Sequence, residues 1–153
     1  MIQENKELLL KDLCARIPYE VVGKCEIDAS YDTSFDTIFQ IHKFDAEVYG
    51  IKEDLLLVNP LIEDNDEQTF AEEEVADGVD ILEFTPYLFP LSSMTDAEKE
   101  EYCQLQQRVI YNSKGPVNED VTKYINWCYK KHLDINNLIP IGLAIDATGL
   151  NIY

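Results

Sequence analysis

The sequence is poor in basic residues and in the two residues that most often interrupt regular structure. Lysine and arginine number 12 against 30 aspartates and glutamates, which gives a formal net charge of −18 at pH 7. A chain this acidic is repelled by nucleic acid and by anionic lipid. With 6 glycines and 6 prolines in 153 residues, collagen-like and low-complexity classes are excluded. No apolar run reaches the roughly 18–20 residues of a membrane span, so we expect neither a nucleic-acid nor a membrane partner.

Cysteine is scarce as well, and its spacing excludes the common zinc and redox motifs. No two of the four cysteines form a Cys-x-x-Cys pair; they are Cys14, Cys25, Cys103 and Cys128. Residues 1–7 carry acids where a secretory signal has a basic start, and the short apolar run Leu8–Leu10 ends at Lys11. We therefore expect a cytoplasmic protein with four reduced thiols, and the even number of cysteines leaves disulfides open as the alternative.

Three helices are predicted from apolar spacing and capping signals. The first covers residues 5–17, where Asn5 is the expected N-cap. The second covers residues 96–108, because Thr95 and Glu98 have the spacing of a capping box. The third carries one apolar face that consists of Val121, Tyr124, Ile125, Cys128 and His132.

Between these helices the apolar period changes to two, which predicts strands. Residues 19–28 form a half-buried strand in which Gly23 marks a bulge or a close approach. Further strands are expected over residues 35–44, 45–49, 55–58 and 79–84. Strands and helices do not alternate, so we expect one α+β domain over residues 1–153 with a small, mostly antiparallel sheet. The strands over residues 45–58 are expected at an edge, where two copies can pair.

The most unusual feature is a dense acidic segment. Between Glu53 and Glu83 there are 12 acidic residues and no lysine or arginine, so this window carries −12 of the net charge. We expect a solvated loop at about residues 60–78, with at most a frayed helical turn. The candidate binding residues are Glu63, Asp64, Asp66, Glu67, Glu72, Glu73 and Glu74.

Motifs for catalysis or metal binding are weak. His42 and His132 lie 90 residues apart and belong to no His-x-x-x-His or His-Glu-x-x-His pattern. Residues 64–68 resemble the start of a calcium loop, but Thr69 stands where an EF-hand requires glycine. Residues 142–149 resemble an Asp-bearing phosphate loop, yet almost no chain follows them. We therefore predict no cofactor and no metal site, and we assign no catalytic residue.

A proline-flanked segment interrupts the second half of the chain. Residues 85–91 place Tyr87, Leu88 and Phe89 between two prolines, which favours an extended backbone. Aromatic residues in such a segment more often fill an edge of the core than form an exposed recognition segment, although the sequence leaves both readings open.

Three stretches resemble a known group of proteins. They are residues 86–95 (Pro-Tyr-Leu-Phe-Pro-Leu-Ser-Ser-Met-Thr), residues 6–16, and Trp127 with 132–134, 138–139 and 142–144 near the end. Together they resemble small uncharacterised proteins of gut anaerobes, often encoded within phage or other mobile DNA. Residues 30–83 depart from that pattern. The group has no established activity, so the resemblance implies only a context, which is a bacterial cytoplasm and a phage or prophage gene.

Three functional hypotheses follow. The first is a non-enzymatic cytosolic protein that binds another protein, one with a basic surface, through the acidic segment. The second is an acidic mimic of DNA that inhibits a nucleic-acid-binding protein, because a row of carboxylates can imitate the phosphates of a duplex. The third is an enzyme whose unrecognised site uses His42 or His132 with nearby carboxylates, which predicts a concave pocket holding a perturbed histidine or carboxylate. The oligomeric state stays open.

Overall fold

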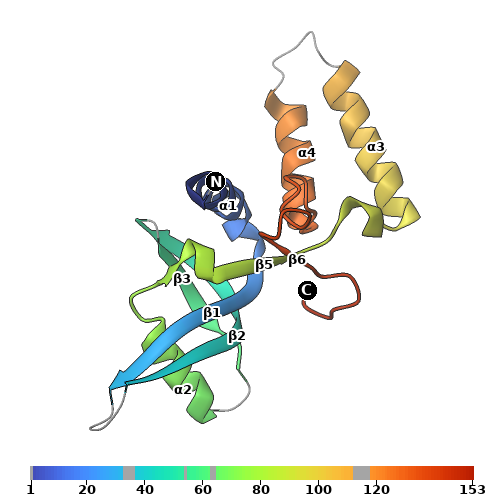
Figure 1. Ribbon diagram of the computed structural model, residues 1–153. Coiled ribbons are helices and arrows are strands. Elements are labelled where there is room, and N and C mark those ends of the chain that lie inside the picture. Colours follow the sequence, from blue (N-terminus) through green and yellow to red (C-terminus); the bar gives the residue numbers. More distant parts are fainter. Residues whose placement is uncertain (1, 33–36, 54, 63–64, 112–117) are drawn as a thin grey trace.

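A six-stranded sheet forms the centre of the molecule, with the strand order β4-β3-β2-β1-β5-β6 (Figure 1). The computed structural model describes residues 2–32, 37–53, 55–62, 65–111 and 118–153. The strands are β1 (Val21–Asp32), β2 (Thr37–Lys52), β3 (Leu55–Pro60), β4 (Val79–Asp80), β5 (Phe84–Leu88) and β6 (Ile145–Asp146). Neighbouring strands are antiparallel, except that β5 and β6 are parallel.

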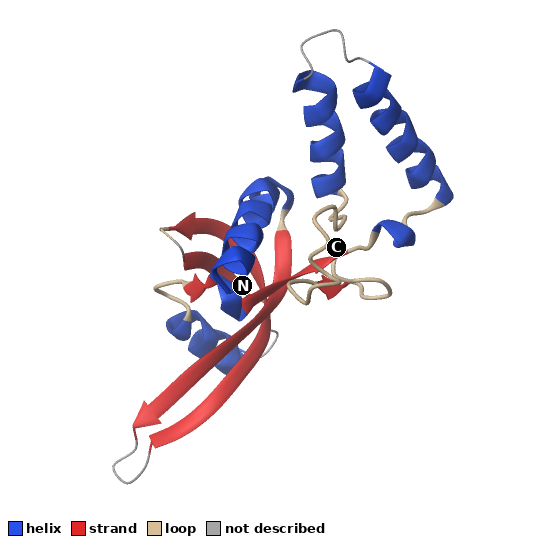
Figure 2. Ribbon diagram, turned by 45° about the horizontal axis from the view of Figure 1, so that its top comes forward, coloured by secondary structure: helices blue, strands red, loops and turns tan. Residues whose placement is uncertain are grey.

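Helices from the start, the middle and the second half of the chain surround this sheet, as Figure 2 shows. They are α1 (Ile2–Arg16), α2 (Asn65–Glu74), α3 (Asp96–Tyr111) and α4 (Asn118–Lys130), with 3₁₀ turns η1 (Ile17–Tyr19), η2 (Ile81–Glu83) and η3 (Leu91–Ser93). The predicted α+β class, with an N-terminal helix, a mostly antiparallel sheet and two C-terminal helices, is confirmed.

Helix α1 lies on the sheet through its apolar side chains. Leu9 and Leu13 are buried in the same cluster as Phe84 of β5. The helix begins at Ile2, so Asn5 lies inside it, and the prediction of Asn5 as the N-cap is wrong. It ends at Arg16, because Pro18 occupies the following 3₁₀ turn.

Strand β2 is longer than predicted. One continuous strand replaces the two expected over residues 35–44 and 45–49, because Asp45 does not interrupt the alternation. Its carboxylate instead accepts a hydrogen bond of 2.7 Å from the Tyr87 hydroxyl of β5. Phe44 and Val48 point into the core, and His42 shares their face, opposite the exposed Ile41.

The expected sheet edge over residues 45–58 is wrong for β2 and correct in part for β3, whose outer side is covered by a strand along two residues only. Strand β2 pairs with β1 on one side and β3 on the other, and β3 carries β4 along Leu55 and Leu56. At the other end of β3, the side chain of Gln68 in α2 makes two hydrogen bonds to the backbone. Its Nε2 atom donates to the Pro60 carbonyl (3.0 Å), and its Oε1 atom accepts from the backbone N–H of Ile62 (3.1 Å). Helix α2 thus takes up polar backbone groups that a bare edge leaves open.

The backbones of β1 and β5 cross closely at Gly23. A Cβ placed there would lie 2.6 Å from the Thr85 carbonyl oxygen and 2.8 Å from the Pro86 Cα. Only glycine fits such an approach, so the predicted close contact is confirmed. Tyr87 and Leu88 beyond this crossing are buried and Phe89 is half-buried, which agrees with the prediction that these three residues fill an edge of the core, whereas Leu91 is exposed.

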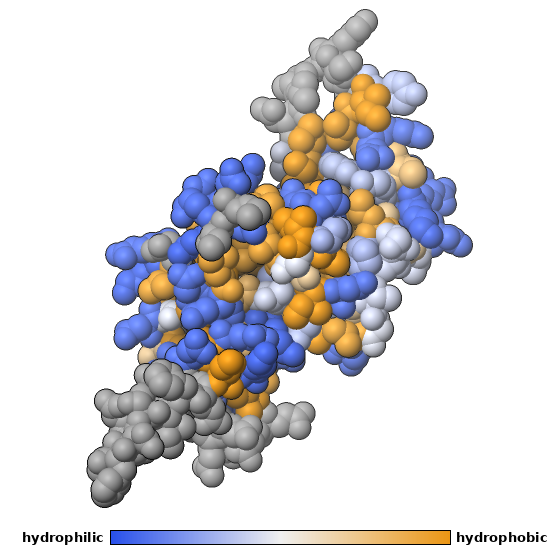
Figure 3. All heavy atoms as spheres, in the orientation of Figure 1, coloured by the Kyte–Doolittle hydropathy of each residue, from blue (hydrophilic) through white to orange (hydrophobic). Residues whose placement is uncertain are grey.

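Helices α3 and α4 form a hairpin that projects from the sheet (Figure 1). Tyr102 packs between Tyr124 and Trp127 at ring-centroid distances of 5.4 and 6.2 Å. No residue of α3 is buried, and apolar side chains stay visible along the hairpin in Figure 3. The predicted capping box is confirmed, since the Glu98 amide donates to Thr95 Oγ1 (3.2 Å) and Glu98 accepts from the Thr95 amide (2.9 Å). The loop predicted at residues 112–116 lies outside the described residues.

Candidate functional site

A pocket of about 280 Å³ lies at the foot of the α3–α4 hairpin. Figure 1 shows the C-terminal end of the chain here, beside β5 and β6 and below α4. The lining residues come from the end of β5, the start of α3, the end of α4 and the C-terminus. They are Phe89, Ser93, Met94, Glu98, Lys130, Lys131, His132, Leu133 and Tyr153.

The end of α4 shapes one wall of this pocket. His132 has a left-handed backbone (φ 52°), its amide donates to Tyr129 O (2.9 Å), and the Leu133 amide donates to Cys128 O (3.0 Å). These two bonds form a Schellman motif, in which glycine usually takes the position of His132. The chain then joins the end of β5, because the Phe89 amide donates to the His132 carbonyl at 2.9 Å. A non-glycine residue with this backbone often marks a functional position.

The His132 ring is packed into this wall and stays neutral. It stacks on Tyr153 with ring centroids 3.6 Å apart and planes 12° apart, and only 8% of the residue is exposed. Burial, and secondarily the positive charge of Arg16, lowers its pKa to about 4. Within the described chain its Nδ1 atom has no hydrogen-bond partner.

The charged groups of the pocket are two lysines and one glutamate. Lys131 Nζ lies 3.0 Å from Glu98 Oε1. Hydrogen bonding from the Thr95 backbone and then from Lys131 lowers the Glu98 pKa to about 2, so this carboxylate is ionised at neutral pH. No carboxylate of the described residues forms an ion pair with Lys130. Lys130 is therefore the pocket lysine with which an anion can pair without displacing an ion pair.

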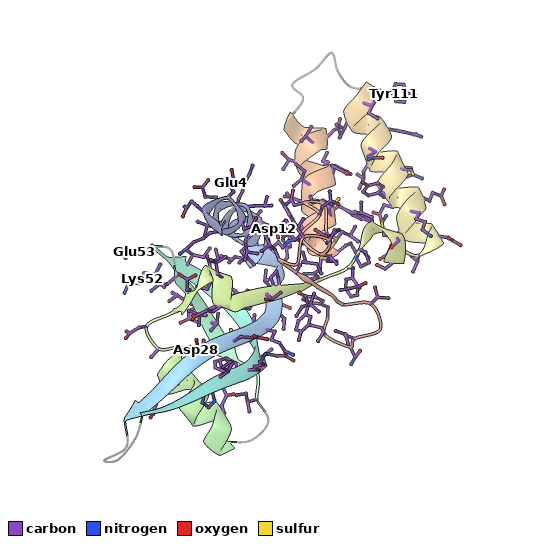
Figure 4. The ribbon with its side chains drawn as sticks, in the orientation of Figure 1. Glu4, Asp12, Asp28, Lys52, Glu53 and Tyr111 are labelled. Atoms are coloured by element: carbon purple, nitrogen blue, oxygen red, sulfur yellow. The ribbon has the colours of Figure 1, made fainter. Side chains whose placement is uncertain are left out.

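A buried ion pair holds the pocket wall against α1. Arg16 Nε lies 2.6 Å from Asp12 Oδ2, and both side chains are fully buried. The same guanidinium donates to the Leu133 carbonyl (2.8 Å) and lies 4.7 Å from the centre of the Tyr129 ring. Asn136 donates to Asp12 at 2.7 Å, and Figure 4 places Asp12 on the side of α1 that faces α4. This network fixes the turn that carries His132.

The predicted acidic residues that the structure describes lie on one helix, away from the pocket. Residues 65–74 form α2 where a loop was predicted, because Ala71 and Val75 are buried on the core and glutamate is a good helix former. The side chains of Glu72, Glu73 and Glu74 are exposed, and no lysine or arginine in the described part of the chain forms an ion pair with them. Asp66 and Glu67 belong to the same helix, and Glu63 and Asp64 lie outside the described residues. Figures 1 and 2 show α2 at the opposite end of the sheet from the hairpin.

The pocket meets one condition of the enzyme hypothesis and lacks another. It is concave and holds a perturbed histidine and a perturbed carboxylate, His132 and Glu98. Ser93 Oγ, however, donates to Pro90 O (2.7 Å), and no hydrogen bond within the described residues joins it to His132. His42 lies opposite Ile27 in the β1–β2 register, so the two predicted histidines do not form one site.

Two further kinds of site receive no support. Across residues 2–32, 37–53, 55–62, 65–111 and 118–153, no three His, Cys, Asp or Glu side chains gather closely enough to hold a metal ion. All four cysteines are free thiols. Burial raises the pKa of Cys25 to about 12 and that of Cys128 to about 11, which makes both thiols unreactive.

Sequence reasoning missed most of the pocket. The sequence indicates Glu98 as a capping residue and Lys130 and Lys131 as helix-terminal charges, and consecutive basic residues in so acidic a chain are the one signal that points to the pocket. Tyr153 gave no signal, because its contact with His132 depends on tertiary structure.

The chain was compared with protein-family models, with curated proteins and with solved structures. No family model matches the chain, and neither a curated protein nor a solved structure matches it. Among the described helices, none has both the length and the apolar character that crossing a membrane requires.

Proposed function

We propose that this chain is a non-enzymatic protein-binding protein of the bacterial cytoplasm, whose partner presents a basic surface to α2. The observation that carries the proposal is the row of exposed glutamates, Glu72, Glu73 and Glu74, on a helix whose other side is packed on the core. Carboxylates held on a packed helix are presented in a fixed arrangement, which a solvated loop does not provide.

The geometry of α2 supports recognition of several cations at once. Consecutive helix residues are about 100° apart around the axis, so three in a row fan out across the exposed side. The described lysines and arginines form no ion pair with them, and their mutual repulsion is relieved when a basic partner binds. Charge complementarity of this kind accelerates association and makes binding sensitive to salt.

The cytoplasmic and phage-related parts of the proposal have separate support. Four free thiols suit a reducing compartment. The resemblance of residues 86–95 to proteins encoded in mobile DNA favours a phage or prophage origin.

The test is affinity capture from a bacterial lysate with three baits. The first is the native chain, and the second is the E72Q/E73Q/E74Q variant. The third, E7Q/E100Q/E101Q, is a matched control with the same change in charge at exposed residues of α1 and α3. We expect a partner that the native chain and the control retain, that the α2 variant loses, and that about 0.5 M salt releases. Equal capture by all three baits would contradict the role of α2.

A second candidate, an acidic mimic of DNA, gains from the same helix. Mimicry requires carboxylates in an ordered array, and α2 supplies order where the sequence predicted a loop. The two candidates differ in one measurement. If the captured partner binds duplex DNA, and if DNA displaces it from the native chain, the mimic is favoured. If DNA has no effect on the complex, the chain is a protein-binding protein of another kind.

A further inference from the structure

We propose that the pocket at the foot of the α3–α4 hairpin binds a small organic anion that carries an aromatic ring, such as an aromatic carboxylate. This site is separate from the acidic face of α2 and does not depend on the function proposed for that face. The argument rests on the walls of the pocket, on its charge and on one unpartnered polar atom.

The walls of the pocket favour a flat, apolar body. Phe89 and Tyr153 lie 6.1 Å apart between ring centroids, and Tyr153 continues the aromatic surface by stacking on His132. Met94 and Leu133, both buried, complete the apolar lining. Aromatic rings and a thioether are good contacts for another ring. A volume of about 280 Å³ lies just below the ~300–1,000 Å³ of drug-sized sites, so a ligand with one ring fits best.

The charges at the pocket favour an acidic group on that body. Glu98 compensates Lys131 through the 3.0 Å ion pair, which leaves Lys130 as the ammonium available to a ligand. Lys130 and Lys131 are both exposed, whereas Leu133 and His132 are buried. A bound anion would therefore lie with its carboxylate toward the lysines and its ring against the aromatic wall.

His132 adds a ring and an unpartnered polar atom to the wall of the pocket. The residue is more than nine-tenths buried, it lines the pocket, and its Nδ1 atom has no hydrogen-bond partner among the described residues. A neutral imidazole has one N–H donor and one acceptor nitrogen. Buried polar atoms of native proteins are nearly always hydrogen-bonded, so the unpartnered Nδ1 atom marks the wall of the pocket as incompletely satisfied, as does the Nη1 atom of Arg16 behind it, which also lacks a partner in the described chain. Nδ1 itself is closed to solvent, so a ligand contacts the exposed edge of the ring and reaches this atom only if the ring turns.

The experiment uses the full chain and 4-fluorobenzoate, observed by fluorine NMR. We expect saturable binding in the millimolar range, as is usual for a ligand of about ten non-hydrogen atoms. The neutral analogue 4-fluorobenzamide keeps the ring and loses the charge, and it is expected to bind at least threefold more weakly. No saturable binding of 4-fluorobenzoate up to 10 mM, or equal binding of the two probes, overturns the proposal.

Two pairs of variants place the probe in the pocket. Lys130→Gln is expected to weaken binding two- to fivefold, whereas Lys123→Gln, which removes an exposed charge of α4 outside the pocket lining, leaves it unchanged. Tyr153→Ala is expected to weaken binding up to about tenfold, whereas Tyr153→Phe keeps the ring, loses only the hydrogen bonds of the hydroxyl, such as the one to the Tyr87 carbonyl (2.9 Å), and is expected to weaken binding less than Tyr153→Ala does. Equal effects of Lys130→Gln and Lys123→Gln, or no effect of Tyr153→Ala, show that the probe binds elsewhere and refute the assignment.

Discussion

Replacing Arg16 by methionine removes the cation of a fully buried ion pair and tests the architecture that supports the pocket. Arg16 donates to both oxygens of Asp12, at 2.6 and 3.1 Å, and to the Leu133 carbonyl at 2.8 Å. Both side chains of the pair have no exposed surface. In the variant, Asp12 keeps only the hydrogen bond from Asn136, and the Leu133 carbonyl loses this donor.

The expected loss follows from what is left behind. Removing one partner of a buried pair usually lowers the free energy of unfolding by about 3–5 kcal/mol, because the remaining charge is buried without compensation. For a chain of this size that corresponds to a melting temperature lower by roughly 6–20 °C. The double variant D12L/R16M also removes the stranded carboxylate. We therefore expect it to be more stable than Arg16→Met alone.

Urea unfolding of the native chain and these variants measures the effect. The transition midpoint is expected to fall in Arg16→Met while the slope stays unchanged, which assigns the change to stability. Lys11→Met, the same kind of substitution at an exposed position of α1, is the control and is expected to stay within about 0.5 kcal/mol of the native chain. A loss below about 1 kcal/mol in Arg16→Met, or a double variant less stable than the single one, refutes the reasoning.

Three other substitutions test separate parts of the fold. Gly23→Ala is expected to destabilise the chain by about 1–3 kcal/mol in urea unfolding, because its Cβ meets the backbone of β5, whereas Gly50→Ala in β2 is the tolerated control, with its nearest contact at 3.4 Å. Thr95→Ala is expected to lower stability by about 1 kcal/mol through loss of the α3 cap, measured by thermal unfolding. His132 has a folded pKa of about 4, below the ordinary value of 6.5, so the unfolded chain binds more protons between these values. The stability due to neutral His132, about 3 kcal/mol, is present above pH 6.5 and is lost as the pH falls toward 4. His132→Asn, which also tolerates the left-handed backbone, should flatten that part of the stability profile, and an unchanged profile would contradict the assignment.

The elements that the sequence predicted well are those with a strong local signal. The box of Thr95 and Glu98 predicts α3, and the alternation after residue 19 predicts β1, because each depends on neighbours along the chain. The bounds of β1 differ from the prediction, since Tyr19 belongs to η1 and the strand continues to Asp32. Strand β2 was divided in two since an aspartate in a strand reads as an interruption. What stabilises Asp45 there is the hydroxyl of Tyr87, 42 residues away.

Helix α2 and the pocket were not predicted from the sequence, because both depend on contacts between residues far apart in the chain. Acidic composition predicted a loop, whereas the packing of Ala71 and Val75 against the sheet stabilises a helix. The pocket requires that the end of β5, the end of α4 and the C-terminus meet. Their meeting depends on the parallel pairing of β5 with β6 and on the bridge between Phe89 and Leu133. No periodicity in the sequence encodes these contacts, so the Tyr153–His132 stack was not predictable from it.

The fold separates the two proposed binding surfaces, which carry opposite charges. A chain with 30 acidic residues attracts cations over most of its surface, so an anion needs a local exception in order to bind. The end of α4 provides this exception with Lys130 and Lys131, and the ionised Glu98 compensates one of them. The acids of α2 lie at the other end of the sheet, and electrostatic interactions between exposed groups decay over about 8 Å at physiological ionic strength. Each surface can therefore recognise a partner of opposite charge without cancelling the other, which explains how one acidic chain can present both.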